Sequence, residues 1–296
     1  MPADTAPARV LVLGLGYSGR HLAALLQAQG IACSGTVRDP ANAADDGLQR
    51  HRLADGEPLD AGLRAAIRSA EAIVCSVPPD ADGDPALRLL GDALQDAPAL
   101  RWVGYFSSTA VYADRDGGWI DAQATADATD DTALKRLRAE QQWRAFAQAR
   151  GIASALFRLP GLYGRGRNAL VQLAQGKARQ VLRPGQVFNR LHVEDLATAV
   201  LAAMQRPQGH ALYLLADDEA APSQAVLAHA AALSGLPLPA AQAWDDPALP
   251  PSLRRFYASN KRIDSRSTRD ALQWQPRFAT YRDGLADAWA HGDGRR

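Results

Sequence analysis

The chain has 296 residues, of which 47% are hydrophobic and 22% charged, with a formal net charge of +1. This length suits one large domain or two closely joined ones. Because no run of like charges stands out, we expect neither nucleic acid nor a membrane surface as a partner. No apolar stretch approaches the roughly 20 residues of a membrane helix, and the N-terminus lacks an export pattern. We therefore expect a soluble cytoplasmic protein.

The first half of the chain alternates strand-like and helix-like segments. Short apolar runs predict strands at residues 10–13, 31–37, 72–77, 102–107 and 152–159. Helical spacing of apolar residues predicts helices between the first two strands, at 59–69, at 86–94 and at 132–149. Strands separated by helices imply right-handed βαβ units. The predicted fold class is therefore α/β, with a Rossmann-type doubly wound parallel sheet.

The pattern changes after Pro160, where loops rich in Gly, Arg and Pro begin. A helix is predicted at 196–205, a short strand at 211–215 and another helix at 223–233. We assign residues 1–160 to a dinucleotide-binding domain, to which a helix at 191–206 returns. Residues 161–190 and 207–296 would then form a smaller, irregular C-terminal substrate domain.

A glycine pattern between the first predicted strand and helix carries the strongest functional signal. Gly14, Gly16 and Gly19 form G-x-G-x-x-G, with Tyr17 and Ser18 between the last two glycines. Gly14 would allow a tight turn, Gly16 a close approach of backbone to pyrophosphate, and Gly19 close packing of helix on strand. An ordinary glycine-rich turn is the alternative. The position favours a dinucleotide on the helix N-terminus.

The end of the second predicted strand bears on the choice of cofactor. NAD sites usually carry an acidic residue there, whereas NADP sites tend to carry Arg. Arg38 suits a 2′-phosphate because a guanidinium can bind it with two hydrogen bonds. Asp39 keeps NAD as the alternative. We predict NADP.

Several further segments resemble a known family in their order and spacing. They are Ser107-Ser-Thr-Ala-Val-Tyr112, Phe157-Arg-Leu-Pro-Gly-Leu-Tyr-Gly164, Arg190-Leu-His-Val-Glu-Asp195 and Ala271-Leu-Gln-Trp-Gln-Pro276. With the glycine loop, they resemble the extended short-chain dehydrogenase/reductase superfamily. The resemblance is strongest to members of the NAD-dependent epimerase/dehydratase type, which include nucleoside-diphosphate-sugar epimerases.

The resemblance implies roles for residues along the cofactor. Asp55 would contact adenine, and Ser108 would be the catalytic Ser/Thr of the family, although such a hydroxyl can also simply bond local backbone. Further cofactor-binding positions would follow the fourth, fifth and sixth strands of the family: Ser76, Val77, Pro78, Ser107, Pro160 and Gly161.

The chain departs from the family at its acid–base pair. Tyr-x-x-x-Lys places a phenol and an ammonium group one helical turn apart, so that the phenol can exchange a proton while nicotinamide exchanges hydride. No such motif occurs in this sequence, and the matching positions carry Thr132 and Arg136. An aliphatic hydroxyl and a guanidinium cannot exchange a proton with the substrate in this way at neutral pH. Lys135, Tyr112 and Tyr163 are the candidate substitutes. We place Tyr163 in the catalytic set with Ser108, Thr132 and Arg136, and Arg136 also among the cofactor-binding residues.

Cations in the second half of the chain are candidates for substrate binding. Together they would suit a diphosphate or a carboxylate, and their alternative is a solvated surface; they are Arg165, Arg167, Arg190, Lys261 and Arg262. His192, before a predicted helix, is interpreted as a buried structural imidazole. Cys33 and Cys75 are expected to be buried thiols, and no spacing indicates a metal site.

Two functions of different classes follow. The first is an NAD(P)-dependent oxidoreductase or epimerase that acts by hydride transfer on a small carbonyl or hydroxyl compound, such as a nucleoside-diphosphate sugar. The second is a non-catalytic NADP-binding sensor or scaffold, which Thr132 and Arg136 favour. The resemblance is compatible with a homodimer.

Overall fold

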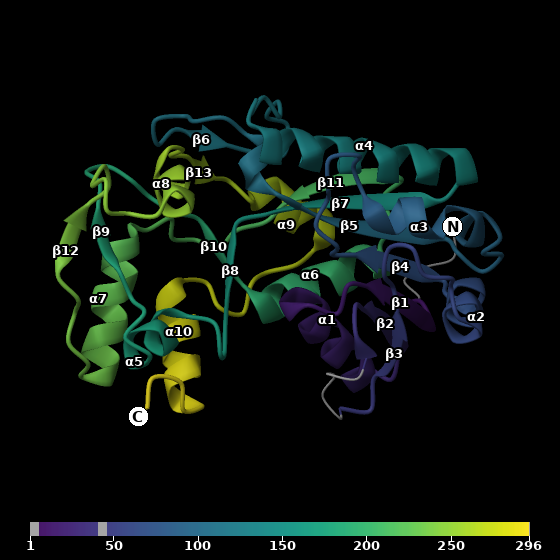
Figure 1. Ribbon diagram of the computed structural model, residues 1–296, viewed down its shortest axis with the longest axis horizontal. Helices are drawn as coiled ribbons and strands as arrows, with labels where there is room; N and C mark the ends of the chain where they lie inside the picture. The colour runs from purple at the N-terminus through teal and green to yellow at the C-terminus, as the bar shows by residue number, and fades with distance from the viewer. Residues whose placement is uncertain (1–5, 41–45, 296) are drawn as a thin grey trace.

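A central parallel sheet carries helices on both faces and a smaller lobe beside it (Figure 1). The computed structural model describes residues 6–40 and 46–295. Within these residues the sheet has seven strands in the order β11-β7-β5-β4-β1-β2-β3, and all neighbours are parallel. The strands are β1 (Arg9–Leu13), β2 (Ala32–Val37), β3 (Gln49–Arg52), β4 (Ala72–Cys75), β5 (Trp102–Ser108), β7 (Ala153–Leu159) and β11 (His210–Leu214). The predicted doubly wound fold is confirmed.

Two helical layers bury the two faces of the sheet. One face carries α1 (Tyr17–Ala28), α6 (Val193–Gln205) and α9 (Arg266–Leu272), and the other carries α2 (Ala61–Ser69), α3 (Pro85–Gln95) and α4 (Asp131–Arg150). Successive side chains of a strand point to opposite faces. Val10 and Val12 therefore pack toward α1 and α6, whereas Leu11 and Leu13 pack toward the other layer. This double burial explains why β1 is apolar throughout.

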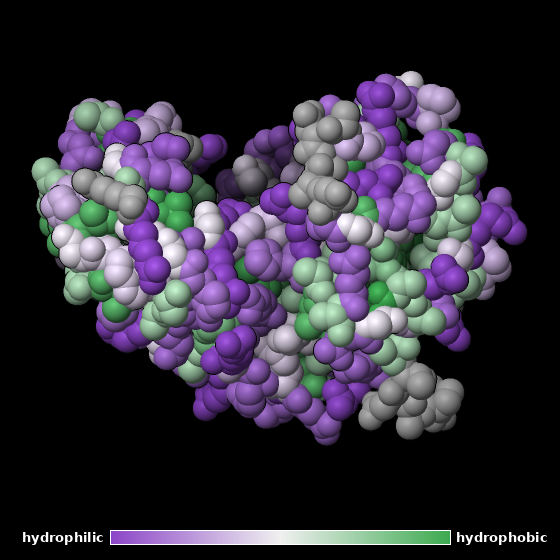
Figure 2. Space-filling view, turned by 90° about the horizontal axis from the view of Figure 1, so that it is seen from below, coloured by the Kyte–Doolittle hydropathy of each residue, from purple (hydrophilic) through white to green (hydrophobic). Residues whose placement is uncertain are grey.

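The smaller lobe consists of short helices and two-stranded pairs. Its helices are α5 (Ala169–Ala174), α7 (Ser223–Ser234), α8 (Pro251–Tyr257) and α10 (Tyr281–Ala290). The pairs are β8 (Gly161–Tyr163) with β10 (Arg190–His192) and β9 (Gln180–Leu182) with β12 (Ala241–Ala243). A further pair, β6 (Trp119–Ile120) with β13 (Arg262–Ile263), packs against Leu214 and Ala216 at the end of the main sheet. The core of the lobe gathers apolar side chains of α5, α7 and α10. Seen from below, the surface is hollowed between this lobe and the sheet (Figure 2).

The border between the two parts differs from the expected one. We expected residues 207–296 to lie entirely in the smaller domain, but β11 forms the last strand of the main sheet beside β7. Helix α9 also packs against α6 beneath that sheet. The reason is that Tyr213 and Leu215 bury their apolar surface in the core that contains Phe157 and α6. Helix α6 packs against α1, as the predicted return of 191–206 requires.

Candidate functional site

The loop after β1 has the geometry of a phosphate cradle. Gly14 has φ +91°, and a Cβ there would lie 2.9 Å from the Ser76 hydroxyl oxygen. A Cβ on Gly19 would lie 2.3 Å from the Gly14 carbonyl oxygen, so only glycine lets α1 pack this close. At Gly16, by contrast, no heavy atom of the described residues lies within 4 Å of the Cβ position. The open space is therefore at the glycine that would face a pyrophosphate.

Helix α1 differs from its neighbours in how it begins. The N-termini of α2, α3 and α4 are capped by the carboxylates of Asp60, Asp84 and Asp130. At α1 the N-cap is Gly16, with no side-chain cap and no acidic residue in the first turn. Its first amide groups are thus left for a ligand, and the helix dipole favours an anionic one.

Side chains from two neighbouring strands fix the loop from behind. The Thr36 hydroxyl accepts a hydrogen bond from Gly14 N at 2.9 Å, and the Thr36 carbonyl accepts one from Leu15 N at 2.8 Å. The Ser76 hydroxyl donates to the Gly14 carbonyl at 2.6 Å. Ser76 therefore shapes the loop in addition to lining the cleft.

The expected adenosine end is open to solvent. Arg38 and Asp39 are exposed directly after β2, and Asp55 is exposed in the turn after β3. Because β2 and β3 are adjacent parallel strands, both positions lie at the carboxyl edge of the sheet, on the side of the phosphate loop. Val77 is half-buried and Pro78 exposed after β4.

A cleft of about 330 Å³ continues from the phosphate loop to the end of β5. Its lining includes the expected catalytic Ser108 and eight of the expected cofactor positions, namely Gly16, Tyr17, Ser18, Ser76, Ser107, Arg136, Pro160 and Gly161. Arg136 donates from Nη1 to the Tyr105 hydroxyl at 3.1 Å and to the Phe106 carbonyl at 2.9 Å. The Ser108 hydroxyl accepts from Ala110 N at 3.1 Å, which leaves its own proton to donate.

Comparisons with known proteins agree with this geometry. Residues 86–214 match the NAD dependent epimerase/dehydratase family. A functionally unknown conserved protein from Silicibacter pomeroyi is 38% identical, with 98% of this chain and 100% of that one covered and a TM-score of 0.87. The chain belongs to the NAD-dependent epimerase/dehydratase family. This assignment confirms the resemblance found in the sequence motifs.

Two more relatives extend across nearly the whole chain. The 3-diazoavenalumate denitrifying reductase of a Streptomyces species is 29% identical, with 94% of this chain and 99% of that one covered. A candidate NAD-dependent epimerase/dehydratase from Methylobacillus flagellatus is 25% identical, with 96% and 98% covered and a TM-score of 0.73.

The family's acid–base positions are occupied very differently in this member. Arg136 lies in the cleft, as its spacing from Ser108 predicts. Thr132 is exposed in the first turn of α4, because Asp130 caps and thereby starts the helix just before it. Its placement speaks against the catalytic role that we expected. Lys135 forms an ion pair with Asp131 at 2.6 Å and is not among the described residues that line the cleft.

The two candidate tyrosines are held inside the protein. Tyr163 is buried in the smaller lobe and donates to the Thr280 carbonyl at 3.2 Å. Tyr112 is fully buried, and its hydroxyl accepts from Arg158 Nη1 at 2.9 Å. Burial raises the pKa of both phenols. These contacts argue against the proton-transfer role that we expected for Tyr163, and also against Tyr112 as its substitute.

A buried ion pair beneath the cleft was missed by the sequence analysis. Arg158 and Glu140 share two hydrogen bonds, of 3.0 and 2.7 Å, with side chains only 8% and 5% exposed. Ser107 donates a short hydrogen bond to Glu140, and Arg158 also bonds Tyr112. The network thus ties β5, α4 and β7 together directly under Ser108.

The five cations predicted to bind substrate do not form one cluster. Arg190 and Lys261 line a second cleft, which adjoins the first at Ser108. Arg165 pairs with Asp287 at 2.8 Å, and Arg167 lies over the Tyr17 ring on the side of the phosphate loop. The remaining cation, Arg262, donates to the Gly117 carbonyl beside β6. Of the five, Arg190 and Lys261 thus line the second cleft and Arg167 lines the cofactor cleft.

His192 has the structural role that its position suggests. Its Nδ1 accepts from Glu194 N at 3.3 Å, and its ring packs 3.8 Å from that of Phe278. Burial lowers its pKa to about 4, so it is neutral at physiological pH. Within residues 6–40 and 46–295, no three His, Cys, Asp or Glu side chains are grouped to hold a metal, and no helix is long and apolar enough to cross a membrane.

Proposed function

We propose that this protein is an NADP-dependent reductase that delivers hydride to a small electrophile without giving it a proton from a Tyr/Lys pair. The observation that carries the proposal is that the cofactor cleft keeps a phosphate-binding loop but lacks the acid–base pair. The phosphate loop fits a dinucleotide, whereas Arg136 stands where the family has its Lys. The lining of this cofactor cleft offers Arg136, Arg167 and Tyr17 as its ionisable groups, and burial raises the pKa of Tyr17 to about 12.

NADP is proposed over NAD because Arg38 directly follows β2. An exposed guanidinium there can bind a 2′-phosphate by two charge-assisted hydrogen bonds. Arg38→Gln should weaken NADPH binding about tenfold and leave NADH binding unchanged, since about 1.4 kcal/mol of interaction is lost. Arg68→Gln, an exposed arginine of α2, is the matched control. Isothermal titration of both cofactors measures the difference, and a wild-type preference for NADH would contradict the proposal.

In this proposal, Ser108 orients the substrate and Arg136 helps to hold the cofactor. NADPH, when bound, supplies the hydride. The Ser108 hydroxyl can donate a hydrogen bond to a polar atom of the substrate. Arg136 is held at the end of β5 by Tyr105 and Phe106, where it can bond ribose hydroxyls but cannot give up a proton at neutral pH.

One relative supports a reduction of this type. Its name describes a reductase that removes nitrogen from 3-diazoavenalumate. When hydride replaces a diazonium group, a C–H bond forms, the C–N bond breaks and N2 leaves with the bonding electrons. No oxygen has to be protonated. A cleft without a Tyr/Lys pair can support such a step, and it can equally reduce other electron-poor acceptors.

The test is oxidation of NADPH followed at 340 nm with a panel of acceptors. The panel contains an aryl diazonium salt, a quinone and simple aldehydes. We expect turnover with the diazonium salt or the quinone, and a loss of about 10- to 100-fold in kcat for Ser108→Ala with the NADPH Kd unchanged. Tight NADPH binding without turnover of any acceptor would instead support the sensor or scaffold function.

A further inference from the structure

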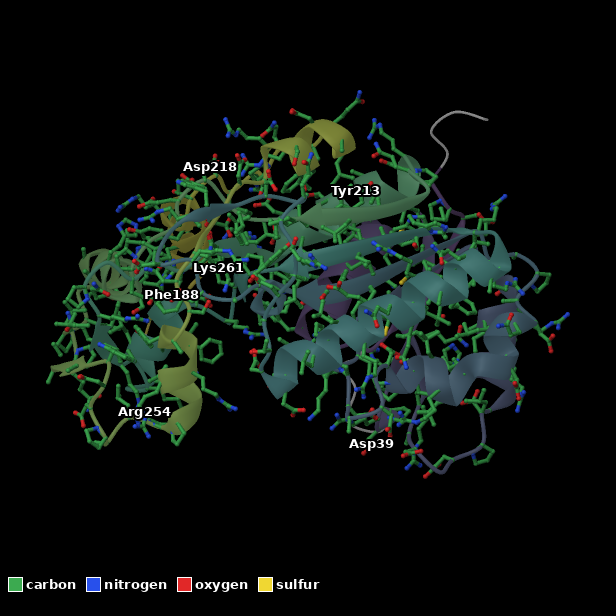
Figure 3. All side chains as sticks on the ribbon, turned by 90° about the horizontal axis from the view of Figure 1, so that it is seen from above. Asp39, Phe188, Tyr213, Asp218, Arg254 and Lys261 are labelled. Atoms are coloured by element: carbon green, nitrogen blue, oxygen red, sulfur yellow. The ribbon has the colours of Figure 1, made fainter. Side chains whose placement is uncertain are left out.

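The second cleft, of about 540 Å³, opens from the nicotinamide end toward the smaller lobe. It shares Ser108, Leu159, Pro160 and Gly161 with the cofactor cleft, so a molecule in it would lie beside the hydride donor. Phe188 and Lys261, which both line it, lie at the junction of the two lobes (Figure 3).

Three cations line its wall, and of these Arg255 is exposed. For Lys261 and Arg190 the described part of the chain offers no ion pair, and Asp114 acts on Lys261 only through space. Lys261 is only 8% exposed, and its Nζ donates to the carbonyls of Tyr112 and Ala113 and to the Ser259 hydroxyl, all neutral acceptors. Arg190 donates from Nη1 to the carbonyls of Phe188 and Ala221. Burial lowers the pKa of both groups. An enclosed cation without an anionic partner is costly, and a bound anion would offset that cost.

The nearest carboxyl group to Arg190 does little to balance it. Asp217 acts on Arg190 through space rather than as an ion-pair partner. Burial raises the pKa of Asp217 to about 8, so this carboxyl is mostly protonated at neutral pH. The positive potential in the cleft is therefore left for a ligand.

The rest of the wall is apolar and aromatic. Val187, Leu253 and Leu159 line it together with Phe188 and Tyr257, whose rings meet edge to face at 5.0 Å. Phe256 also lines it and is 68% exposed. Apolar side chains of this size around a cleft are typical of sites that hold a flat apolar group.

The neutral polar side chains of the wall are largely engaged with the protein itself. Asn189 bonds Lys261 O through its amide nitrogen and Ile263 N through its oxygen. Ser223 bonds the Tyr257 hydroxyl at 2.6 Å. A nucleoside-diphosphate sugar would bring two phosphates and many hydroxyls into this space. Few free partners are left to bind those hydroxyls.

We infer that this cleft binds a small aromatic carboxylate, with its carboxylate toward Lys261 and Arg190 and its ring against Phe188 and Tyr257. This inference rests on the proposed function, since it names the substrate class of that reductase. It places a different compound class in the cleft from the sugar nucleotides expected for relatives of the epimerase type.

The test compares ligands on the wild-type protein saturated with NADP. Isothermal titration with trans-cinnamate, its neutral analogue cinnamamide, hexanoate and UDP-glucose separates charge from ring. We expect cinnamate to bind at least tenfold more tightly than each of the other three. Equal binding of cinnamate and cinnamamide, tighter binding of UDP-glucose, or no cinnamate binding by protein that does bind NADP would each overturn the inference.

A pair of variants tests the position of the anion. Lys261→Met should reduce the cinnamate-to-cinnamamide ratio at least fivefold, whereas Arg254→Met should leave it unchanged. Arg254 loses the same charge from α8 but is not among the residues that line the cleft. An unchanged ratio in folded Lys261→Met would place the anion elsewhere and contradict the inference. Protein that fails to bind NADP at all would instead contradict the proposed function.

Discussion

The phosphate loop and the substrate end of the cofactor cleft differ in how their polar groups are bonded. At the phosphate loop, backbone amides of the uncapped α1 face open space, and glycines keep that space free. Toward the substrate, side chains bond one another: Arg136 to Tyr105, and Arg158 to Glu140. Dinucleotide binding therefore depends on local backbone geometry, whereas the surroundings of the substrate depend on contacts between distant segments. Cofactor binding can thus persist in a chain whose acid–base pair has changed.

Glu140→Gln tests whether the buried ion pair supports the substrate end. Arg158 would remain buried without its counter-charge, so we expect a loss of about 3–5 kcal/mol in the free energy of unfolding. Lys135→Gln on the same helix removes a surface pair and should cost less than about 0.5 kcal/mol. Urea unfolding measures both. Equal small losses would show that this end does not depend on the network.

Gly19→Ala and Gly16→Ala distinguish the packing of the phosphate loop from its affinity for the cofactor. In Gly19→Ala the added Cβ would meet the Gly14 carbonyl oxygen, so we expect a loss of about 1–3 kcal/mol in stability together with loss of cofactor binding. At Gly16 the Cβ meets open space, so stability should change little while NADPH affinity falls at least tenfold. Thermal unfolding and cofactor titration measure the two effects. Unchanged affinity in Gly16→Ala would mean that no phosphate approaches this residue.

Asp217→Asn should have an effect on stability that depends on pH. Burial raises the folded-state pKa of Asp217 to about 8, so the folded protein holds a proton that the unfolded chain releases from about pH 4 upward. Wild-type stability therefore falls as the pH rises from about 4 to 8. The Asn variant lacks this loss, so its stability relative to the wild type should increase steadily between about pH 4 and pH 8.

Asp218→Asn is the matched control for this pH effect. Asp218 forms a half-exposed pair with Arg269, so its removal should shift stability by less than about 1 kcal/mol. Unfolding curves at pH 5, 7 and 9 check the prediction. A stability difference between wild type and Asp217→Asn that does not grow with pH would contradict it.

The features that could be predicted are those whose cause is local in the sequence. The glycine loop spans six residues, so its geometry can be predicted from the spacing of its glycines alone. The polar strand β3 was missed because its sequence, QRHR, has no apolar alternation and only His51 is buried. Thr132 was placed by counting, but the cap at Asp130 decides where α4 begins.

Long-range contacts account for the rest of what the sequence analysis missed. Glu140 and Arg158 are 18 residues apart, and Tyr112 lies 46 residues from Arg158, so no short motif connects them. The five cations share a positive charge but reach three separate places, because loops from different elements carry them.

The position of β11 affects how the protein unfolds. The chain leaves the sheet after β7, passes through β8, α5, β9, β10 and α6, and returns as β11 directly beside β7. The excursion thus begins and ends in two strands that are hydrogen-bonded to each other. Releasing this segment requires breaking the sheet edge, so heating should melt both parts in one cooperative transition. During synthesis, the sheet cannot be completed until Leu214 has left the ribosome.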